Sequence, residues 1–362
     1  MPAQNPDATP LTQVRVGAFK SWLSLWIALA MSAGMGLGLL APDAFQTLGA
    51  LSFAQVNPVT AILVWLLILP TMVQIDYSDL PAVWRSRSWR AGSALTLATN
   101  WLIKPFTMAL LAIVFLKYLF AQWIPVAEAD QYIAGLILLG VAPCTGMVFV
   151  WSRMTDGDAG FTLAQVSLND IILLIAFAPI AGLLLGASGI SVPWLTLGIS
   201  TAAYVIVPLI AGFGLRQILL RQGLGALDAF GAWTGPLTKA GLILLVVLLF
   251  GFQAEAIVEA PLVIALIAIP LIIQALGIFA IAYSAAFALK LPNRIAAPAA
   301  LIGTSNFFEL AVAIAVAMFG VNSLAVIATV VGVLVEVPVM LAMVAFANRM
   351  APALNARAEG KA

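Results

Sequence analysis

The residues VAPCTG at 141–146 and IGTSN at 302–306 decide the fold of this chain, because each interrupts a long apolar stretch near its middle. Such interruptions free backbone polar groups, which a membrane tolerates only inside protein or around a water-filled cavity. They stand about 162 positions apart, close to the 172 positions between the starts of the first and sixth apolar stretches. A matching pair of interrupted spans indicates a transport site, although proline and glycine are also common in ordinary membrane helices.

The composition excludes a soluble protein. The 362 residues are 63% hydrophobic and 9% charged, whereas a soluble domain is roughly 45–50% apolar and about 25% charged. The chain has no histidine and a single cysteine, which excludes Ser-His-Asp triads, internal disulfides and multi-thiolate metal cages. A net charge of +1 with scattered basic residues gives no sign of nucleic-acid binding. No P-loop is present, and we expect no cofactor.

Ten apolar stretches are long enough to cross a hydrocarbon core of about 30 Å. Because five is odd, a duplicated five-helix half must insert upside down relative to the first, as in many secondary transporters. The predicted spans are 21–40, 57–74, 91–116, 131–151, 162–186, 193–215, 236–254, 261–289, 296–319 and 323–347.

The sequence therefore predicts an all-α integral membrane protein with ten transmembrane helices in two inverted five-helix repeats. The repeats occupy 21–186 and 187–347, and helices four and nine are expected to be broken and to cross. The segments 1–20 and 348–362 are expected to be cytoplasmic tails, the first leading into a retained span without a cleavage signature.

The distribution of basic residues predicts the orientation. If the N-terminus is cytoplasmic, 14 of the 16 Lys and Arg residues lie on the inside, while Lys117 lies near the outside and Lys104 within the third span. The positive-inside rule then places both termini in the cytoplasm. We expect a multi-pass protein of the cell (inner or plasma) membrane.

Cys144 is the first candidate for chemistry, since it follows Pro143 in the fourth span. Proline suits the first turn of a new half-helix, and a thiol at a helix N-terminus favours the thiolate. A thiolate is a soft ligand for soft centres. The alternative is a small buried hydrophobic residue, and position alone does not separate the two.

Glu309 lies at a similar depth in the ninth span. A charge at the bilayer centre costs at least about 2.5–3.5 kcal/mol, so such carboxylates usually face a cavity and have a function. Asn306 and Glu309 also have the spacing of a capping box. A carboxylate that caps the helix end when ionised and releases it when protonated would be a proton-coupled switch.

Other polar residues also lie within spans. Asn100 and Lys104 share one face of the third span, and Asn169 and Asp170 lie in the fifth. We expect Lys104 and Asp170 to form a structural ion pair rather than to contact substrate. Glu336, before Pro338 in the tenth span, is either a proton-relay member or a capped kink, and the sequence leaves both open.

These motifs resemble the arsenite efflux permeases of the arsenical-resistance type, within the bile acid, arsenite and riboflavin transporters. The resemblance extends in order from about residue 60 to 347 and rests on five stretches: GVAPCTGMVFVWSRMTDGD at 140–158, VSLNDIILLIAFAP at 166–179, NWLIKPF at 100–106, ALIGTSNFFELAVAIAVAMFG at 300–320 and GVLVEVPVML at 332–341. Gly146, where alanine is expected, and the basic loop 84–90 depart from the family pattern.

The resemblance implies a proton-driven exporter of trivalent arsenic in which panel and core domains are built from both repeats. Its critical residues would be the cysteine of span four and the glutamate of span nine, here Cys144 and Glu309. We hypothesise that arsenite, as substrate, is ligated by Cys144, with Thr145, Ser305 and Asn306 hydrogen-bonding its hydroxyls. Protonation of Glu309 from the outside would then reset the carrier.

The expected partners are arsenite, protons and membrane lipid, and the sequence does not decide between arsenite and antimonite or whether a homo-oligomer forms. The nearest alternative is a sodium-coupled organic-anion symporter, in which Asn306 and Glu309 would hold sodium. A remote alternative is an intramembrane enzyme with Cys144 as nucleophile. It lacks a recognisable oxyanion donor set and a third orienting residue, so we do not expect an enzyme.

Overall fold

The computed structural model describes residues 23–51, 57–74 and 86–360. Within these ranges the chain is helical apart from short connections, and it forms no strand beyond one isolated β-bridge. The predicted tail at 1–20, the basic Arg15 and Lys20, and Trp84 and Arg85 of the basic loop lie outside the described residues.

Six continuous helical segments are long and apolar enough to cross a membrane, and a seventh forms if α2 (Leu23–Leu40) and the bent α3 (Pro42–Ala50) count as one span. This confirms the prediction of an all-helical, multi-pass membrane protein. All ten predicted stretches coincide with helices, although several are short or interrupted. The count of ten spans and the two inverted repeats stay predictions.

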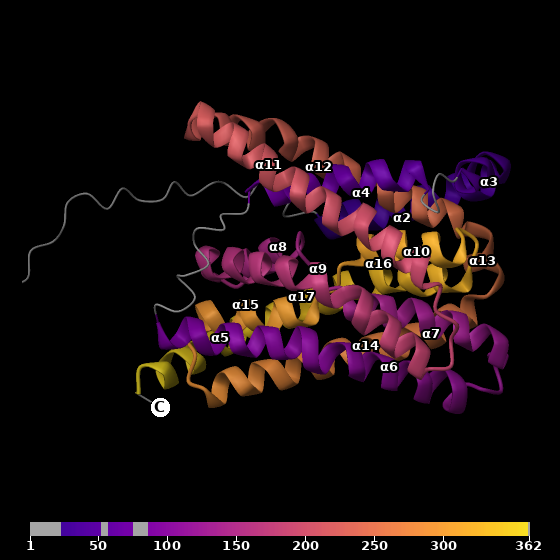
Figure 1. The fold of residues 1–362 in the computed structure, drawn as a ribbon. Helices are drawn as coiled ribbons and strands as arrows, with labels where there is room; N and C mark the ends of the chain where they lie inside the picture. Colours follow the sequence, from indigo (N-terminus) through magenta and orange to yellow (C-terminus); the bar gives the residue numbers. More distant parts are fainter. Residues whose placement is uncertain (1–22, 52–56, 75–85, 361–362) are drawn as a thin grey trace, which may run out of the picture.

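Four helices pack together in one layer, which we call the panel: α2, α4 (Pro58–Gln74), α11 (Val207–Gln222) and α12 (Leu224–Phe252). They lie at the top of Figure 1. The contact between α2 and α12 is close because glycines stand at Gly34 and Gly38. A Cβ at either would come within 2.4 Å of a carbonyl oxygen of α12. Small residues at this spacing are typical of tightly packed membrane helices.

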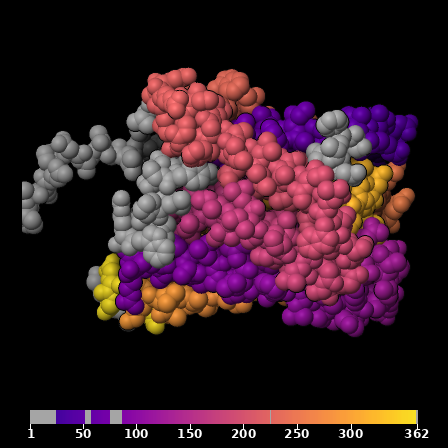
Figure 2. Space-filling view, viewed as in Figure 1, coloured from indigo at the N-terminus to yellow at the C-terminus, as the bar shows by residue number. Residues whose placement is uncertain are grey.

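The remaining long helices form the second unit, which we call the core. Its members are α5 (Arg87–Ala98), α6 (Lys104–Ile113), α7 (Val126–Val141), α8 (Val148–Met154), α9 (Ala159–Ala187), α14 (Pro261–Ala288), α15 (Asn293–Thr304), α16 (Phe308–Phe319) and α17 (Leu324–Ala358). Helix α17 extends past the predicted end at 347, so part of the expected tail is helical. The short helices α10 (Trp194–Thr201) and α13 (Ala254–Glu259) connect the two units. Figure 2 shows α10 and α11 running across the junction between them.

In the described part of the chain, three π-helical segments interrupt the helices: η2 (Thr99–Ile103), η3 (Val114–Leu119) and η4 (Ala202–Ile206). π-Helical turns are frequent at functional sites. Two of these turns hold buried polar side chains, Asn100 in η2 and Tyr204 in η4. They mark where polar groups enter the apolar interior.

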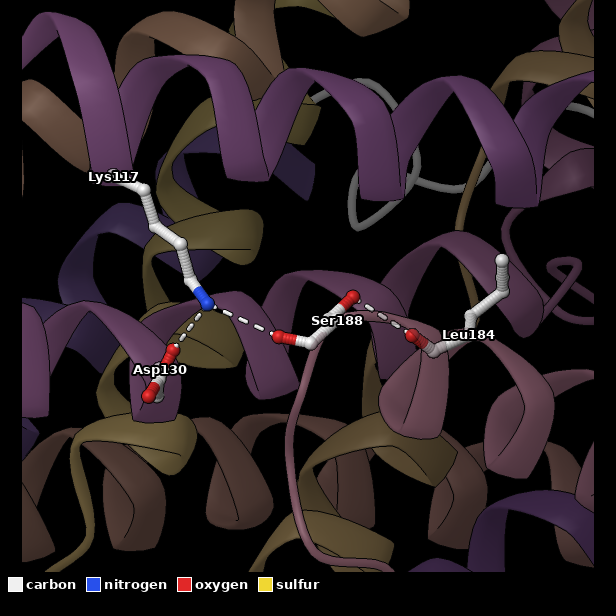
Figure 3. A network of polar contacts seen from close by, with 4 residues as sticks. All are labelled: Lys117, Asp130, Leu184 and Ser188. Carbon is white, nitrogen blue, oxygen red and sulfur yellow. Dashed lines mark hydrogen bonds and ion pairs between the residues drawn. The ribbon is translucent and has the colours of Figure 1, made fainter.

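An ion pair joins three core elements at the end of the molecule away from the C-terminus. The Lys117 ammonium on η3 lies 2.7 Å from the Asp130 carboxylate of α7 and donates to the Ser188 carbonyl, 3.0 Å away, just after α9. Figure 3 shows the lysine reaching both partners, with the Ser188 hydroxyl donating to the Leu184 carbonyl at 2.7 Å. This cluster holds the ends of the third, fourth and fifth predicted spans together.

Candidate functional site

The two broken helices meet, as the sequence predicts. Pro143 and Asn306 form an isolated antiparallel bridge, and the Phe307 amide donates to the Ala142 carbonyl at 2.8 Å. The Cys144 amide donates to the Ser305 carbonyl at 3.4 Å. The backbone groups freed in each break are therefore satisfied by the other break, as burial in a membrane requires. We call residues 142–147 together with 305–307 the crossover.

Cys144 lies at the centre of the crossover and is 2% exposed. The prediction that its thiol begins a new half-helix is wrong, because α8 starts only at Val148. The pairing of Pro143 with Asn306 keeps the backbone extended here, so Cys144 precedes α8 rather than standing in its first turn. The position of the thiol is therefore fixed by the backbone contacts of the crossover.

The predicted capping box is also wrong. The residue before α16 is Phe307, and no side chain caps that helix. The amide of Asn306 donates instead to Oε1 of Glu336 at 3.1 Å, and the Ser305 hydroxyl donates to the same oxygen. Glu336, which belongs to α17, thus stabilises the break of span nine through these two hydrogen bonds. The sequence left Glu336 open between a relay and a kink, and this contact was not predicted.

Lys104 supplies the opposite charge at the same place. Its side chain is fully buried, and its ammonium donates to the Ser305 carbonyl at 3.0 Å. The predicted ion pair between Lys104 and Asp170 is wrong, since both Asp170 oxygens lack a hydrogen-bond partner among the described residues. The ammonium lies at the crossover because the Ser305 carbonyl and the Glu336 carboxyl are both there.

Asn100 and Asn169 pair with each other rather than with the crossover. The Asn169 side-chain oxygen accepts from Asn100 Nδ2 at 3.2 Å and from Trp101 Nε1 at 2.9 Å. Asn169 Nδ2 donates to the Gln165 carbonyl at 2.9 Å. These bonds tie η2 to α9, which gives both asparagines a structural role that the sequence did not reveal.

A cavity of about 170 Å³ separates the crossover from the panel. Two of the five predicted substrate-binding residues line it, Thr145 and Glu309, while Cys144, Ser305 and Asn306 lie behind the wall. Glu309 is 8% exposed. The wall residues are Leu67, Ile68, Thr71, Thr145, Gly146, Met147, Val150, Thr238, Lys239, Leu242, Phe307 and Glu309.

The panel side of this cavity was missed by the sequence analysis. Thr71 of α4 and both Thr238 and Lys239 of α12 line it. Each threonine hydroxyl donates to its own helix, Thr71 to the Ile68 carbonyl at 2.6 Å and Thr238 to the Thr234 carbonyl at 3.0 Å. Their oxygens are left as acceptors. Polar residues on otherwise apolar spans were the available signal.

Glu336 faces a second, smaller space of about 10 Å³ that shares Met147 and Leu242 with the main cavity. The Glu309 and Glu336 carboxyls therefore lie on neighbouring cavities between core and panel. Among the described residues, no three His, Cys, Asp or Glu side chains gather to hold a metal ion. The main cavity thus has one carboxyl in its wall, that of Glu309, with the Cys144 thiol behind the wall and Glu336 on the neighbouring space.

Comparisons with known proteins identify relatives of this chain. The profile of the Sodium Bile acid symporter family matches residues 61–260. The Arsenical-resistance protein Acr3 of Alkaliphilus metalliredigens is 46% identical over 92% of this chain and 93% of its own length. The uncharacterized transporter slr0944 of a Synechocystis species is 44% identical over 92% and 89% of the two chains. The Arsenical-resistance protein Acr3 of Corynebacterium glutamicum is 27% identical over 94% of this chain and 91% of its own.

Proposed function

This chain belongs to the Sodium Bile acid symporter family, and from that premise we propose that it exports trivalent arsenic in exchange for protons. Two relatives named arsenical-resistance proteins align with more than nine tenths of the chain. The observation that carries the proposal is the crossover, where a lone thiol lies beside a cavity that opens between panel and core. A transporter rather than an enzyme fits this family.

The single thiol suits reversible binding of arsenous acid, a neutral trihydroxide. The Cys144 thiol forms one As–S bond, one As–O bond breaks, and the thiol proton leaves with the hydroxide as water. This exchange needs no preformed thiolate, because the thiol proton leaves with the displaced hydroxide. One bond to sulfur can be reversed by water, whereas three would retain the arsenic.

The cavity residues suit the rest of the substrate. The remaining hydroxyls of bound arsenic can donate to Thr145 and to the threonine oxygens of the panel, Thr71 and Thr238. Ser305 and Asn306, assigned to substrate by the sequence, are committed to Glu336 through one hydroxyl and one backbone amide. We therefore propose that they position the crossover, while the unpartnered Asn306 side-chain oxygen stays available to the substrate.

Lys104 supports coupling to protons rather than sodium. A sodium ion at the crossover would need carbonyl and carboxylate oxygens, yet the Ser305 carbonyl already accepts from the Lys104 ammonium. Two cations this close repel each other strongly where the dielectric constant is low. The buried Glu309, which lines the substrate cavity, is then the residue that exchanges a proton with each substrate.

Alternating access follows from where the cavity lies. Its walls come from α4 and α12 of the panel and from the crossover of the core. We propose that one unit rocks on the other, so that the same residues face the cytoplasm and the outside in turn. The end of α17, the start of α5 and the α11–α12 connection lie together at one end of the molecule (Figure 1, left). With Arg87, Arg221 and Arg357 near these points, this end is the cytoplasmic one in the plasma membrane.

The test is arsenite uptake into everted membrane vesicles with an imposed proton gradient and no sodium, comparing wild type with Cys144→Ser. We expect gradient-dependent accumulation in wild type and its loss in the variant. Accumulation that survives in Cys144→Ser would refute the thiol mechanism but keep the exporter. If wild type accumulates arsenite only when sodium is added, or not at all although inserted, the sodium-coupled organic-anion symporter becomes the better assignment.

A further inference from the structure

A third buried carboxyl lies at the junction of core and panel, in a cavity that Phe307 of the crossover also lines. Asp170, near the middle of α9, is 2% exposed, and neither of its oxygens has a hydrogen-bond partner in the described part of the chain. Its neighbour Asn169, in contrast, is fully engaged with η2. Buried polar groups are nearly always paired, so an aspartate without a partner inside a membrane protein indicates a function.

A cavity of about 10 Å³ lies against this carboxyl, which is about the room that one water molecule needs. Both units contribute to its walls, because Asp170 and Leu173 come from α9 while Ile68 and Met72 come from α4 of the panel. The other wall residues are Tyr204, Val205, Leu209 and Phe307. The hydroxyl of Tyr204 is also buried and also lacks a partner among the described residues.

Tyr204 of η4 is the one titratable side chain that shares this wall with Asp170. Lys104, on the adjacent α6, is turned to the Ser305 carbonyl. The other elements packed on α9 are α5, α7, α8, α10 and α15. Their charged and titratable residues all lie outside the cavity wall, namely Arg87, Arg90, Glu128, Asp130, Tyr132, Arg153 and Arg294.

An ionised carboxylate in this cavity would have no counter-ion and no donor beyond one hydroxyl and one water. The penalty for burying an unpaired ion is several kcal/mol after relaxation, so in this conformation the carboxyl carries a proton. Separation of panel from core would open the same wall to water and remove the penalty. Proton binding at Asp170 is thus linked to contact between the two units.

We propose that Asp170 is a second proton-binding site of the transporter, loaded while core and panel are closed over it and released when they part. The site takes a proton and one water molecule, and it shares Ile68 and Phe307, but no polar side chain, with the wall of the substrate cavity. This assignment deepens the proposed proton exchange and rests on it for the identity of the transported solute. The protonation of Asp170 itself does not depend on the substrate.

The first test therefore uses no arsenic. Infrared spectra of the reconstituted full-length protein at neutral pH should contain the carbonyl band of a protonated carboxyl, and that band should lose one component in Asp170→Asn. Tyr204→Phe removes the Tyr204 hydroxyl, the other buried polar group of this wall without a partner among the described residues, and should keep that component. Recording both in a Glu309→Gln background removes the overlapping band of that carboxyl. A band of equal intensity in wild type and Asp170→Asn would overturn the proposal.

The second test uses transport. Proton-driven accumulation of arsenite should fall about fivefold or more in Asp170→Asn, because fivefold is the lower end of typical coupling between two sites. Arsenite exchange measured at equal pH on both sides of the membrane should lose much of its pH dependence. A purely structural role would lower exchange by the same factor at every pH, and that result would also overturn the proposal. Asp170→Ser, smaller and neutral, replaces the amide variant if that does not insert. If wild type moves no arsenite, the proposed function fails while the infrared result still decides Asp170.

Discussion

Replacing Lys104 by methionine tests whether a buried ammonium holds the two broken helices together. The side chain is fully buried, and its ammonium donates to the Ser305 carbonyl at 3.0 Å. The Ser305 hydroxyl donates in turn to Glu336. Methionine keeps the length and apolar stem of lysine, but it leaves the Ser305 carbonyl with only the Cys144 amide as donor, at 3.4 Å, and the carboxylate without its cation.

The magnitude follows from the bond that is lost. A hydrogen bond to a charged group contributes about 1.5–3 kcal/mol, whereas neutral interhelical hydrogen bonds in membranes average about 0.6 kcal/mol. Since 1.36 kcal/mol is a factor of ten, the equilibrium constant for forming the intact crossover should fall by about 13-fold to about 160-fold. A loss above about 1.5 kcal/mol would thus identify charge, rather than packing, as its cause.

The assay is thermal or denaturant unfolding of the purified protein in one detergent, with Lys117→Met as the matched control. Lys117 is 24% exposed and pairs with Asp130, and partly exposed pairs contribute only about 0–1 kcal/mol. We expect Lys104→Met to be clearly less stable than Lys117→Met and to lose arsenite transport. Equal stabilities of the two variants, or unimpaired transport by Lys104→Met, would refute the role given to the ammonium.

Two glycine substitutions give further tests. Gly135→Ala should destabilise the protein by about 1–3 kcal/mol through overpacking, although alanine suits a helix better by up to about 1 kcal/mol. Its Cβ would lie 2.2 Å from the Ala325 carbonyl oxygen of α17. The matched control is Gly277→Ala, where nothing lies within 4 Å of the new atom, and unfolding curves that do not differ would contradict the close packing of α7 on α17. Gly146→Ala also meets nothing within 4 Å, so we expect normal insertion and arsenite transport within about twofold of wild type, since a shift of 0.4 kcal/mol corresponds to about that factor. Loss of transport would show that the cavity has no room for one additional methyl group.

The helices and the two breaks could be predicted from the sequence because each depends on local composition. Apolar length locates a membrane helix, and 141–146 and 302–306 stood out because proline, glycine and polar residues interrupt such lengths. Their meeting could be inferred as well, since freed backbone groups in a membrane need partners. The bridge between Pro143 and Asn306 confirms that reasoning.

The side-chain partners could not be predicted, because they depend on which helix lies opposite. The sequence paired Lys104 with Asp170 and left Glu336 open between a relay and a kink. Instead, Lys104 and Glu336 converge on the crossover, while Asp170 has no hydrogen-bond partner among the described residues. The capping box failed for the same reason. The crossover moves the residue before α16 from Asn306 to Phe307, so a tertiary contact overrides the local spacing.

The charge balance of the crossover bears on which solute the site selects. Lys104 and Glu336 both contact Ser305, so a positive and a negative group lie together there. An alkali cation would have to displace an ammonium fixed by the fold, and an organic anion would meet the Glu309 carboxyl as well as the Lys239 ammonium in a cavity wall that matches neither sign of charge alone. Both would also lose hydration in a low-dielectric space, at a cost that only a matching charge offsets. A neutral trihydroxide avoids both penalties, and in the proposed mechanism the selectivity then depends on Cys144, because sulfur distinguishes arsenic from water and other neutral hydroxyl compounds.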